Sequence, residues 1–164
     1  MTDKELEKIM EIVDMHSKWF PHLTEQGYKI RNRLENRNRY GYLLNEGAFI
    51  TYEFAQVSSR IIKKHFLTKK ENDIVLHQIG SNGKVKGSAK ELLDKLIGIA
   101  KENNSYRIWL TVRKDNVVAR EWYDKNGFKL MYEDDEVWNH SKEGKIGGCI
   151  YKLELENNTL NKFI

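Results

Sequence analysis

Apolar residues that recur every three or four positions predict three helices along the chain. The first follows Thr2, which with Glu5 has the spacing of a capping box at a helix start. A second helix, with a more ragged apolar face, is expected over residues 25–35. The third has the strongest apolar stripe, which consists of Ala89, Leu92, Leu93, Leu96, Ile97 and Ala100.

Short runs of β-branched, aromatic and alternating apolar residues predict strands. Residues 40–44 and 48–54 have this character, and Asn45-Glu46-Gly47 between them has turn chemistry, so they are expected to form a hairpin. Further strands are expected at residues 60–67, 74–79, 106–112, 128–132 and 149–155.

The order of these elements predicts the fold class. A short fourth helix, capped by Asp115 or Asn116 and ended by Gly127, is expected before the last strands. Residues 133–147 are polar and acidic and are expected to form a loop. The sequence therefore predicts one α/β (α+β) domain over residues 1–164. Its mixed sheet is expected to be mostly antiparallel, with one central parallel strand pair and flanking helices.

Length and cysteine content limit the class of protein. The chain has 164 residues, which fits one domain with a substantial core. No apolar run approaches the ~20 residues that a membrane span needs, and the polar amino-terminal residues differ from a signal peptide. Cys149 is the only cysteine, so no internal disulfide can form. These features predict a cytoplasmic protein without a membrane partner.

The positive charge is modest. The formal net charge is +4, which is too small to indicate nucleic-acid binding by itself. Basic residues cluster within residues 29–39 and 63–70. We interpret both clusters as solvated faces, and attraction to a polyanion is the alternative.

Metal chemistry is not expected. The histidines show no ligand spacing, and Cys149, in an apolar strand, is better interpreted as a small core residue than as a nucleophile. The five histidines are His16, His22, His65, His77 and His140.

A basic, glycine-containing segment between a predicted strand and a predicted helix is a candidate anion site. The first N–H groups of a helix lack intrahelical partners, and the helix dipole favours negative charge there. Gly87 allows the close approach of a diphosphate, Lys84 and Lys86 add positive charge, and the Ser88 hydroxyl can donate. Its spacing is not that of a P-loop, and an ordinary surface loop is the alternative. The segment comprises Lys84, Val85, Lys86, Gly87, Ser88 and Ala89.

A second segment helps to interpret this loop. It has the pattern Asn116-x-x-Ala119-x-x-x-Tyr123-x-x-x-Gly127-Phe128. Together with Lys84-x-x-Gly87-x-Ala89, it resembles the Gcn5-related N-acetyltransferase (GNAT) superfamily over residues 73–133. Lysine replaces the Gln or Arg that begins the family's acyl-CoA loop, and alanine replaces its second glycine.

The resemblance implies a site for acetyl-CoA. Backbone groups of His77, Gln78 and Ile79, on a bulged strand that splays from its parallel neighbour, would pair with the pantetheine arm. One of their N–H groups would polarise the thioester carbonyl. Amides of residues 84–89 would hold the pyrophosphate, and the Asn116 side chain would contact the cofactor.

The resemblance also implies an acid and a base. Tyr123 would point at the sulfur and protonate the leaving thiolate, since its phenol is protonated at neutral pH; a core aromatic is the alternative. Asp73 would be the base, acting through water, and His77 is its rival. Asp73 could equally be a turn residue and His77 a satisfied strand histidine. Glu53 and Glu133 are more distant candidates.

The implied function is transfer of an acetyl group from acetyl-CoA to a primary amine. The acceptor could be a small amine, a protein amino terminus or lysine, or an aminoacyl-tRNA, as for toxins of this family. Alternatives are an inactive acyl-CoA-binding or interaction module and a nucleic-acid-binding domain; a homodimer is possible. Residues that could line an acceptor pocket are Trp19, Phe20, His22, Tyr28, Trp138 and His140.

Overall fold

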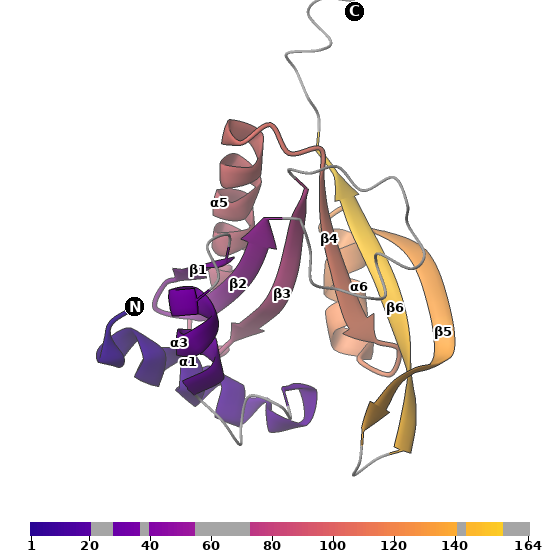
Figure 1. Ribbon diagram of the computed structural model, residues 1–164, viewed down its shortest axis with the longest axis horizontal. Coiled ribbons are helices and arrows are strands. Elements are labelled where there is room, and N and C mark those ends of the chain that lie inside the picture. Colours follow the sequence, from indigo (N-terminus) through magenta and orange to yellow (C-terminus); the bar gives the residue numbers. More distant parts are fainter. Residues whose placement is uncertain (21–27, 37–39, 55–72, 141–143, 156–164) are drawn as a thin grey trace, which may run out of the picture. The chain divides into compact units, whose positions relative to one another are not determined.

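The computed structural model describes most of the chain (Figure 1). The described residues are 1–20, 28–36, 40–54, 73–140 and 144–155. The predicted strand at 60–67 and the acceptor candidate His22 lie outside them, as do the side chains of Tyr28, Trp138 and His140.

The described residues form four α-helices and six strands. The strand order is β1-β2-β3-β4-β6-β5, and one pair of neighbours is parallel. This arrangement confirms the predicted mixed, mostly antiparallel sheet. The helices are α1 (Asp3–Met15), α3 (Tyr28–Asn36), α5 (Ser88–Glu102) and α6 (Val117–Lys125). The strands are β1 (Tyr40–Leu44), β2 (Ala48–Phe54), β3 (Ile74–Ser81), β4 (Arg107–Arg113), β5 (Lys129–His140) and β6 (Gly144–Glu154).

The chain divides into two compact units. Unit 1 comprises Met1–Glu53 and Leu76–Ile99, and unit 2 comprises Phe54–Val75 and Ala100–Ile164. Strand β3 begins in unit 2 and continues in unit 1. A single domain over the whole chain therefore stays a prediction, and each unit is described by itself.

Unit 1 is built around the apolar face of α1. The predicted capping box is present, because Glu5 N–H donates to Thr2 Oγ1 and the Glu5 carboxylate accepts from Thr2 N–H. Behind this cap, helical spacing buries one face of α1 against β2 and α3. Each fully buried side chain contributes about 1.5–3 kcal/mol to stability. The cluster consists of Ile9, Ile12, Val13, Ile30 and Phe49.

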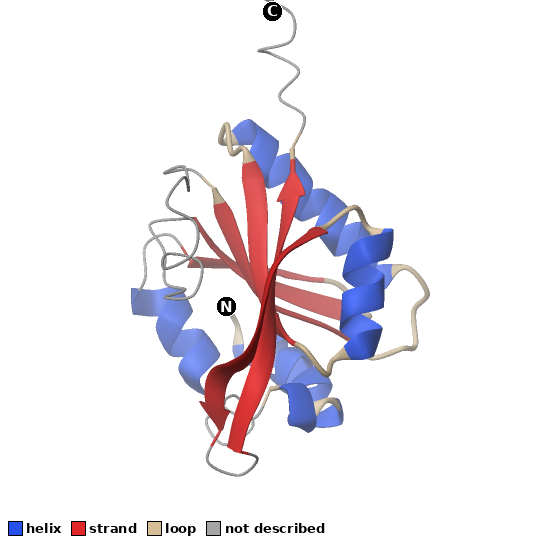
Figure 2. Ribbon diagram, turned by 90° about the vertical axis from the view of Figure 1, so that its right-hand side faces the viewer, coloured by secondary structure: helices blue, strands red, loops and turns tan. Residues whose placement is uncertain are grey.

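Unit 2 combines α6 with β4, β5 and β6. Val75, Trp109 and Ile150 form a buried cluster here. Strand β6 pairs antiparallel with β4 on one side and β5 on the other, and β5 and β6 make a long twisted pair (Figure 2).

The predicted loop at residues 133–147 is wrong, because β5 and β6 extend through most of it. Strand β5 lies at the edge of the sheet. Edge strands tolerate charged residues, which in the sequence are typical of a loop. Gly147 also has a packing reason to be glycine. A Cβ there would lie 2.8 Å from the Asp134 carbonyl oxygen of the paired strand.

Within the part of the chain that the structure describes, no helix combines the length and the apolar character needed to cross a bilayer.

Candidate functional site

The loop between β3 and α5 is open to solvent. Gly83 and Gly87 have positive φ angles of 72° and 76°, a region that glycine enters without strain. A Cβ built on either glycine meets no atom within 4 Å. The Lys84 and Lys86 side chains are exposed. The loop therefore offers an uncovered, positively charged surface before the first turn of α5.

Two of the loop's six backbone N–H groups are already engaged. Lys84 N–H donates to Asn82 Oδ1 at 2.9 Å, and Ser88 N–H donates to the Val85 carbonyl at 3.3 Å. The remaining groups can bind an anion, because no described residue accepts from them. They belong to Val85, Lys86, Gly87 and Ala89.

The turn between β1 and β2 holds this loop in place. Asn45 Oδ1 accepts from Gly47 N–H and Ala48 N–H, which fixes the turn. Asn45 Nδ2 then donates to the Ser88 carbonyl at 3.0 Å. At the other end of the loop, Asn82 N–H donates to the Gly47 carbonyl at 2.8 Å. One turn thus braces both ends of the candidate anion loop.

The Ser88 hydroxyl lies against this turn and does not line the exposed side of the loop. Ser88 is 3% exposed, and its Oγ has no hydrogen-bond partner among the described residues. A Cβ on Gly47 would lie 2.6 Å from Ser88 Oγ and 2.9 Å from Val85 Cβ. The hydroxyl would have to change rotamer before it could donate to a bound anion.

Strand β3 presents His77 beside a carboxylate. His77 Nε2 lies 3.1 Å from Glu53 Oε1 of β2, and both side chains are largely buried, with 17% and 13% exposed. The ring of Tyr40 from β1 stacks on the imidazole, with 5.4 Å between ring centroids. Tyr40 is also the register partner of Glu53. The three side chains therefore share one face of unit 1.

The next residue, Gln78, breaks the alternation of the strand. Its Oε1 accepts hydrogen bonds from Thr51 Oγ1 and from the Tyr40 hydroxyl. Thr51 and Glu53 alternate onto one face of β2, yet they contact the consecutive residues Gln78 and His77. Two consecutive side chains on one face are typical of a β-bulge. Ile79 follows, half-buried.

In unit 2, α6 holds Tyr123 in an aromatic cluster. Its ring contacts Trp122, Phe128 and Tyr151, with centroid distances of 5.8, 5.5 and 5.9 Å. Burial, followed by the nearby Tyr151, raises the pKa of Tyr123 well above its ordinary value. No described residue is hydrogen-bonded to its hydroxyl. The phenol is therefore protonated at neutral pH and is held by ring contacts.

Local signals at both ends of α6 set the position of Tyr123. Asn116 caps the helix by accepting from Ala119 N–H at 3.3 Å, which confirms the cap. Gly127, with φ of 88°, ends the helix as expected. Phe128 N–H then donates to the Tyr123 carbonyl at 3.0 Å in a Schellman arrangement. Because Asn116 Oδ1 caps the helix, the side-chain amide nitrogen is the group that we expect to contact a cofactor.

Asp73 is fully buried and holds the start of β4. Its Oδ1 accepts from Tyr106 N–H at 3.3 Å and its Oδ2 from Trp109 Nε1 at 3.1 Å. The Arg107 guanidinium lies 3.6 Å from Oδ2. These contacts favour a structural role for Asp73 over that of a base.

The sequence matches a family model described as the acetyltransferase (GNAT) family over residues 11–128. The chain belongs to the GNAT acetyltransferase family. No curated protein matches the sequence significantly.

Solved GNAT structures share the fold at low identity. A probable acetyltransferase from Staphylococcus epidermidis is 12% identical with a TM-score of 0.72, covering 95% of this chain and 96% of its own. The ribosomal-protein-S18-alanine N-acetyltransferase from Escherichia coli is 19% identical with a TM-score of 0.55, covering 77% and 76%. An acetyltransferase from Bacillus anthracis, solved with acetyl coenzyme A, is 21% identical with a TM-score of 0.54, covering 74% and 65%.

The candidate site residues of this GNAT chain are divided between the two units. Unit 1 contains Glu53, His77, Gln78, Ile79 and the loop at residues 84–89. Unit 2 contains the other candidates, namely Asp73, Asn116, Tyr123 and Glu133.

The remaining base candidate, Glu133, is engaged in an ion pair. Its carboxylate accepts from Arg120 Nη2 at 2.9 Å, and Arg120 Nε donates to the Tyr151 hydroxyl at 3.0 Å. The Cys149 thiol is 3.7 Å from the same carboxylate oxygen. Burial raises the pKa of Cys149, so the thiol stays protonated, as a core cysteine does.

Two of the acceptor-pocket candidates have other contacts in the structure. Phe20 packs on Phe49 with 6.0 Å between ring centroids and belongs to the core of unit 1. The Lys18 ammonium lies over the Trp19 ring at 4.8 Å. Neither contact assigns the residue to an acceptor pocket.

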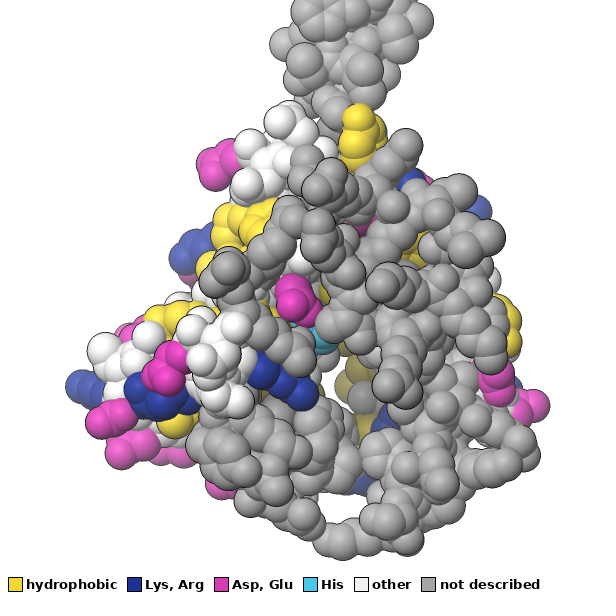
Figure 3. Space-filling model, viewed as in Figure 1, with side chains coloured by type: hydrophobic (Ala, Val, Ile, Leu, Met, Phe, Trp, Pro, Cys, Tyr) yellow, Lys and Arg dark blue, Asp and Glu magenta, His cyan; other side chains and the backbone are white. Residues whose placement is uncertain are grey.

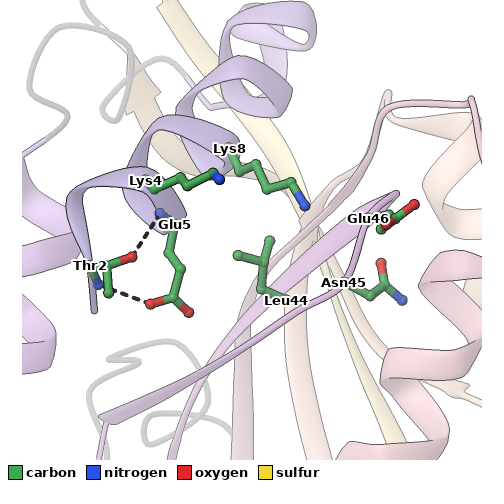
Figure 4. Close-up of a pocket in the computed structure, with 7 residues that line it drawn as sticks. All are labelled: Thr2, Lys4, Glu5, Lys8, Leu44, Asn45 and Glu46. Atoms are coloured by element: carbon green, nitrogen blue, oxygen red, sulfur yellow. Dashed lines mark hydrogen bonds between the residues drawn. The ribbon is translucent and has the colours of Figure 1, made fainter.

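A shallow cavity of about 290 Å³ lies between the start of α1 and the β1–β2 turn (Figure 4). Lys4 and Lys8 extend over it from α1, and Glu46 lies at its other side. None of the predicted site residues lines it. The lining residues are Thr2, Lys4, Glu5, Lys8, Leu44, Asn45 and Glu46.

Charges are mixed on the face of unit 1 that Figure 3 shows. Dark blue and magenta side chains are interspersed over α1 and α3 at the lower left of Figure 3. On this face, the described side chains of α1 and α3 form no single-sign stripe of the kind that characterises nucleic-acid-binding surfaces. Among the described residues, no group of three or more His, Cys, Asp or Glu could hold a metal ion.

Proposed function

We propose that the protein transfers an acetyl group from acetyl-CoA to a primary amine by direct attack of the amine on the thioester. The observation that carries the proposal is the loop before α5, which has four amides that no described residue engages and the side chains of Lys84 and Lys86. Membership of the GNAT family supports the same assignment.

The loop fits a diphosphate. Amides at a helix start bind phosphate oxygens, and the two lysines add a favourable charge that needs no fixed geometry. The glycine at position 87 leaves open space where a larger residue would carry a side chain. The acetyl coenzyme A bound in the Bacillus anthracis structure is consistent with this ligand.

Two residues of this chain would handle the protons. Acetyl-CoA, when bound, supplies an activated thioester with a thiolate leaving group. Before attack, His77 accepts the proton that an ammonium must lose. As the carbon–sulfur bond breaks, the Tyr123 hydroxyl donates its proton to sulfur. The acylated nitrogen loses its second proton to solvent and the proton held by His77 restores Tyr123 through solvent, so that each turnover releases one proton.

Acetyl-CoA should stabilise the protein against heat. A ligand that binds only the folded state adds about 2.7 kcal/mol when its concentration is 100 times Kd. We expect the melting temperature to rise with acetyl-CoA concentration, and addition of a primary amine to release thiol, followed with a thiol-reactive chromophore. Acetate, which lacks the diphosphate, is the control. An unchanged melting temperature at millimolar acetyl-CoA would contradict the proposal.

Gly47→Ala should weaken acetyl-CoA binding without touching the ligand. The new Cβ would lie under 3.0 Å from both Ser88 and Val85, so the anion loop has to shift. We expect Kd for acetyl-CoA to rise about tenfold, which corresponds to ~1.4 kcal/mol, as measured by calorimetric titration.

Gly98→Ala is the matched control for this variant. A Cβ on Gly98, within α5, meets no atom within 4 Å, and alanine is the better helix former. Its Kd should equal that of the wild type. Equal affinities of the Gly47→Ala variant and the wild type would show that the turn does not position the loop.

A further inference from the structure

We propose that Glu53 is the positioning residue for His77, so that the two side chains work as a carboxylate–imidazole pair in the proposed acetyl transfer. The pair deepens the proposed function and rests on it. In this pair Glu53 holds the Nε2–H tautomer of His77, and Nδ1 is the atom that accepts the proton of the amine.

The contact between the two residues carries the inference. His77 Nε2 and Glu53 Oε1 are 3.1 Å apart, a hydrogen-bond distance, and both side chains are largely buried. A carboxylate can only accept, so Nε2 must be the protonated nitrogen. The neutral imidazole then has its lone pair on Nδ1.

Two further contacts hold the imidazole in this orientation. Tyr40 stacks on the ring with an interplanar angle of 20°, which restricts its rotation. The Tyr40 hydroxyl is itself anchored by Gln78 Oε1 at 3.2 Å. Among the described residues of β1 and β2, Glu53 places a carboxylate and Tyr40 a phenol ring against His77.

The chemistry that follows is a single proton transfer. One nitrogen–hydrogen bond of the acceptor ammonium breaks, its electron pair remains on nitrogen, and a new Nδ1–H bond forms. The imidazolium that results is stabilised by the Glu53 carboxylate across Nε2–H, and Glu53 itself exchanges no proton. The same arrangement of carboxylate and imidazole activates bases on unrelated folds.

The tautomer can be tested directly by NMR. We expect long-range ¹H–¹⁵N spectra of the ¹⁵N-labelled protein at pH 8 to show His77 as the Nε2–H tautomer, with its signals assigned from the His77→Gln variant. In Glu53→Ala, both tautomers should be populated. An Nδ1–H tautomer in the wild type would overturn the proposal, even if the variant failed to fold.

A double-mutant cycle separates positioning from a structural role. We follow thiol release from acetyl-CoA with tyramine, spermidine and a peptide with a free amino terminus. His77→Gln should lower kcat about 100-fold and Glu53→Gln about tenfold, with KM for acetyl-CoA unchanged. The double variant should be no slower than His77→Gln, since Glu53 acts only through His77.

Two outcomes would count against the pair. Losses that multiply in the double variant would show that Glu53 acts independently of His77, and a change confined to KM would show a binding role. If the wild type neither binds acetyl-CoA nor releases thiol, the proposed function fails, and the NMR tautomer still decides whether Glu53 positions His77.

Discussion

Tyr123→Phe is expected to lower kcat about 100-fold, the usual size of a general-acid contribution, while acetyl-CoA binds with unchanged affinity. The substitution removes only the hydroxyl, and the phenylalanine ring keeps its contacts with Trp122, Phe128 and Tyr151. Without the donor, the sulfur must leave as a thiolate. Steady-state kinetics of thiol release and calorimetric titration measure the two quantities.

The acid should also stay protonated in alkaline solution. Because burial raises the pKa of Tyr123, wild-type turnover should not lose its acid as the pH rises from 8 to 10. Tyr106→Phe, a change at an exposed tyrosine of unit 2, is the matched control and should turn over at the wild-type rate. If Tyr123→Phe were as fast as this control, the sulfur would need no proton from Tyr123.

Local sequence signals correctly predicted where the helix that carries Tyr123 begins and ends. The Asn116 cap and the Gly127 stop lie within eleven residues of one another, and each acts on the backbone next to it. The same is true of the Thr2 capping box and the Asn45-Glu46-Gly47 turn. Where a structure depends on near neighbours, the residue types were sufficient.

Contacts between distant segments were not predictable in this way. Glu53 and His77 are 24 residues apart, and their meeting depends on the register of β2 and β3 and on the broken alternation at Gln78. Periodicity alone cannot give such a register. The burial of the Ser88 hydroxyl against Gly47 likewise depends on a turn 41 residues upstream.

The extension of β5 and β6 through residues 133–147 was missed for a different reason. Acidic residues and glycines are typical of loops. Charged residues on an edge strand, however, prevent it from pairing with other chains, and β5 is such a strand. Gly147 is required because the Asp134 backbone approaches it closely. The polar residues of this segment indicate only that it is exposed. Whether it forms strands depends on pairing with the rest of the sheet.

Asp73→Ala should lower the free energy of unfolding by about 3 kcal/mol, the range for removing one partner of a buried pair. The change removes the buried carboxylate that accepts from Trp109 Nε1 and lies beside the Arg107 guanidinium. Urea unfolding measures the loss. Asp94→Ala, which removes an exposed partner of Lys90, is the matched control and should cost close to nothing.

Asp73→Asn separates stability from catalysis at this position. The amide can still accept through its oxygen, so the variant should fold, while a carboxamide cannot take a proton at neutral pH. If Asp73 is structural, the folded variant keeps most of the wild-type kcat, whereas His77→Gln does not. A folded, stable Asp73→Asn protein with a 100-fold lower kcat would instead make Asp73 the base and leave the Glu53–His77 pair without that role.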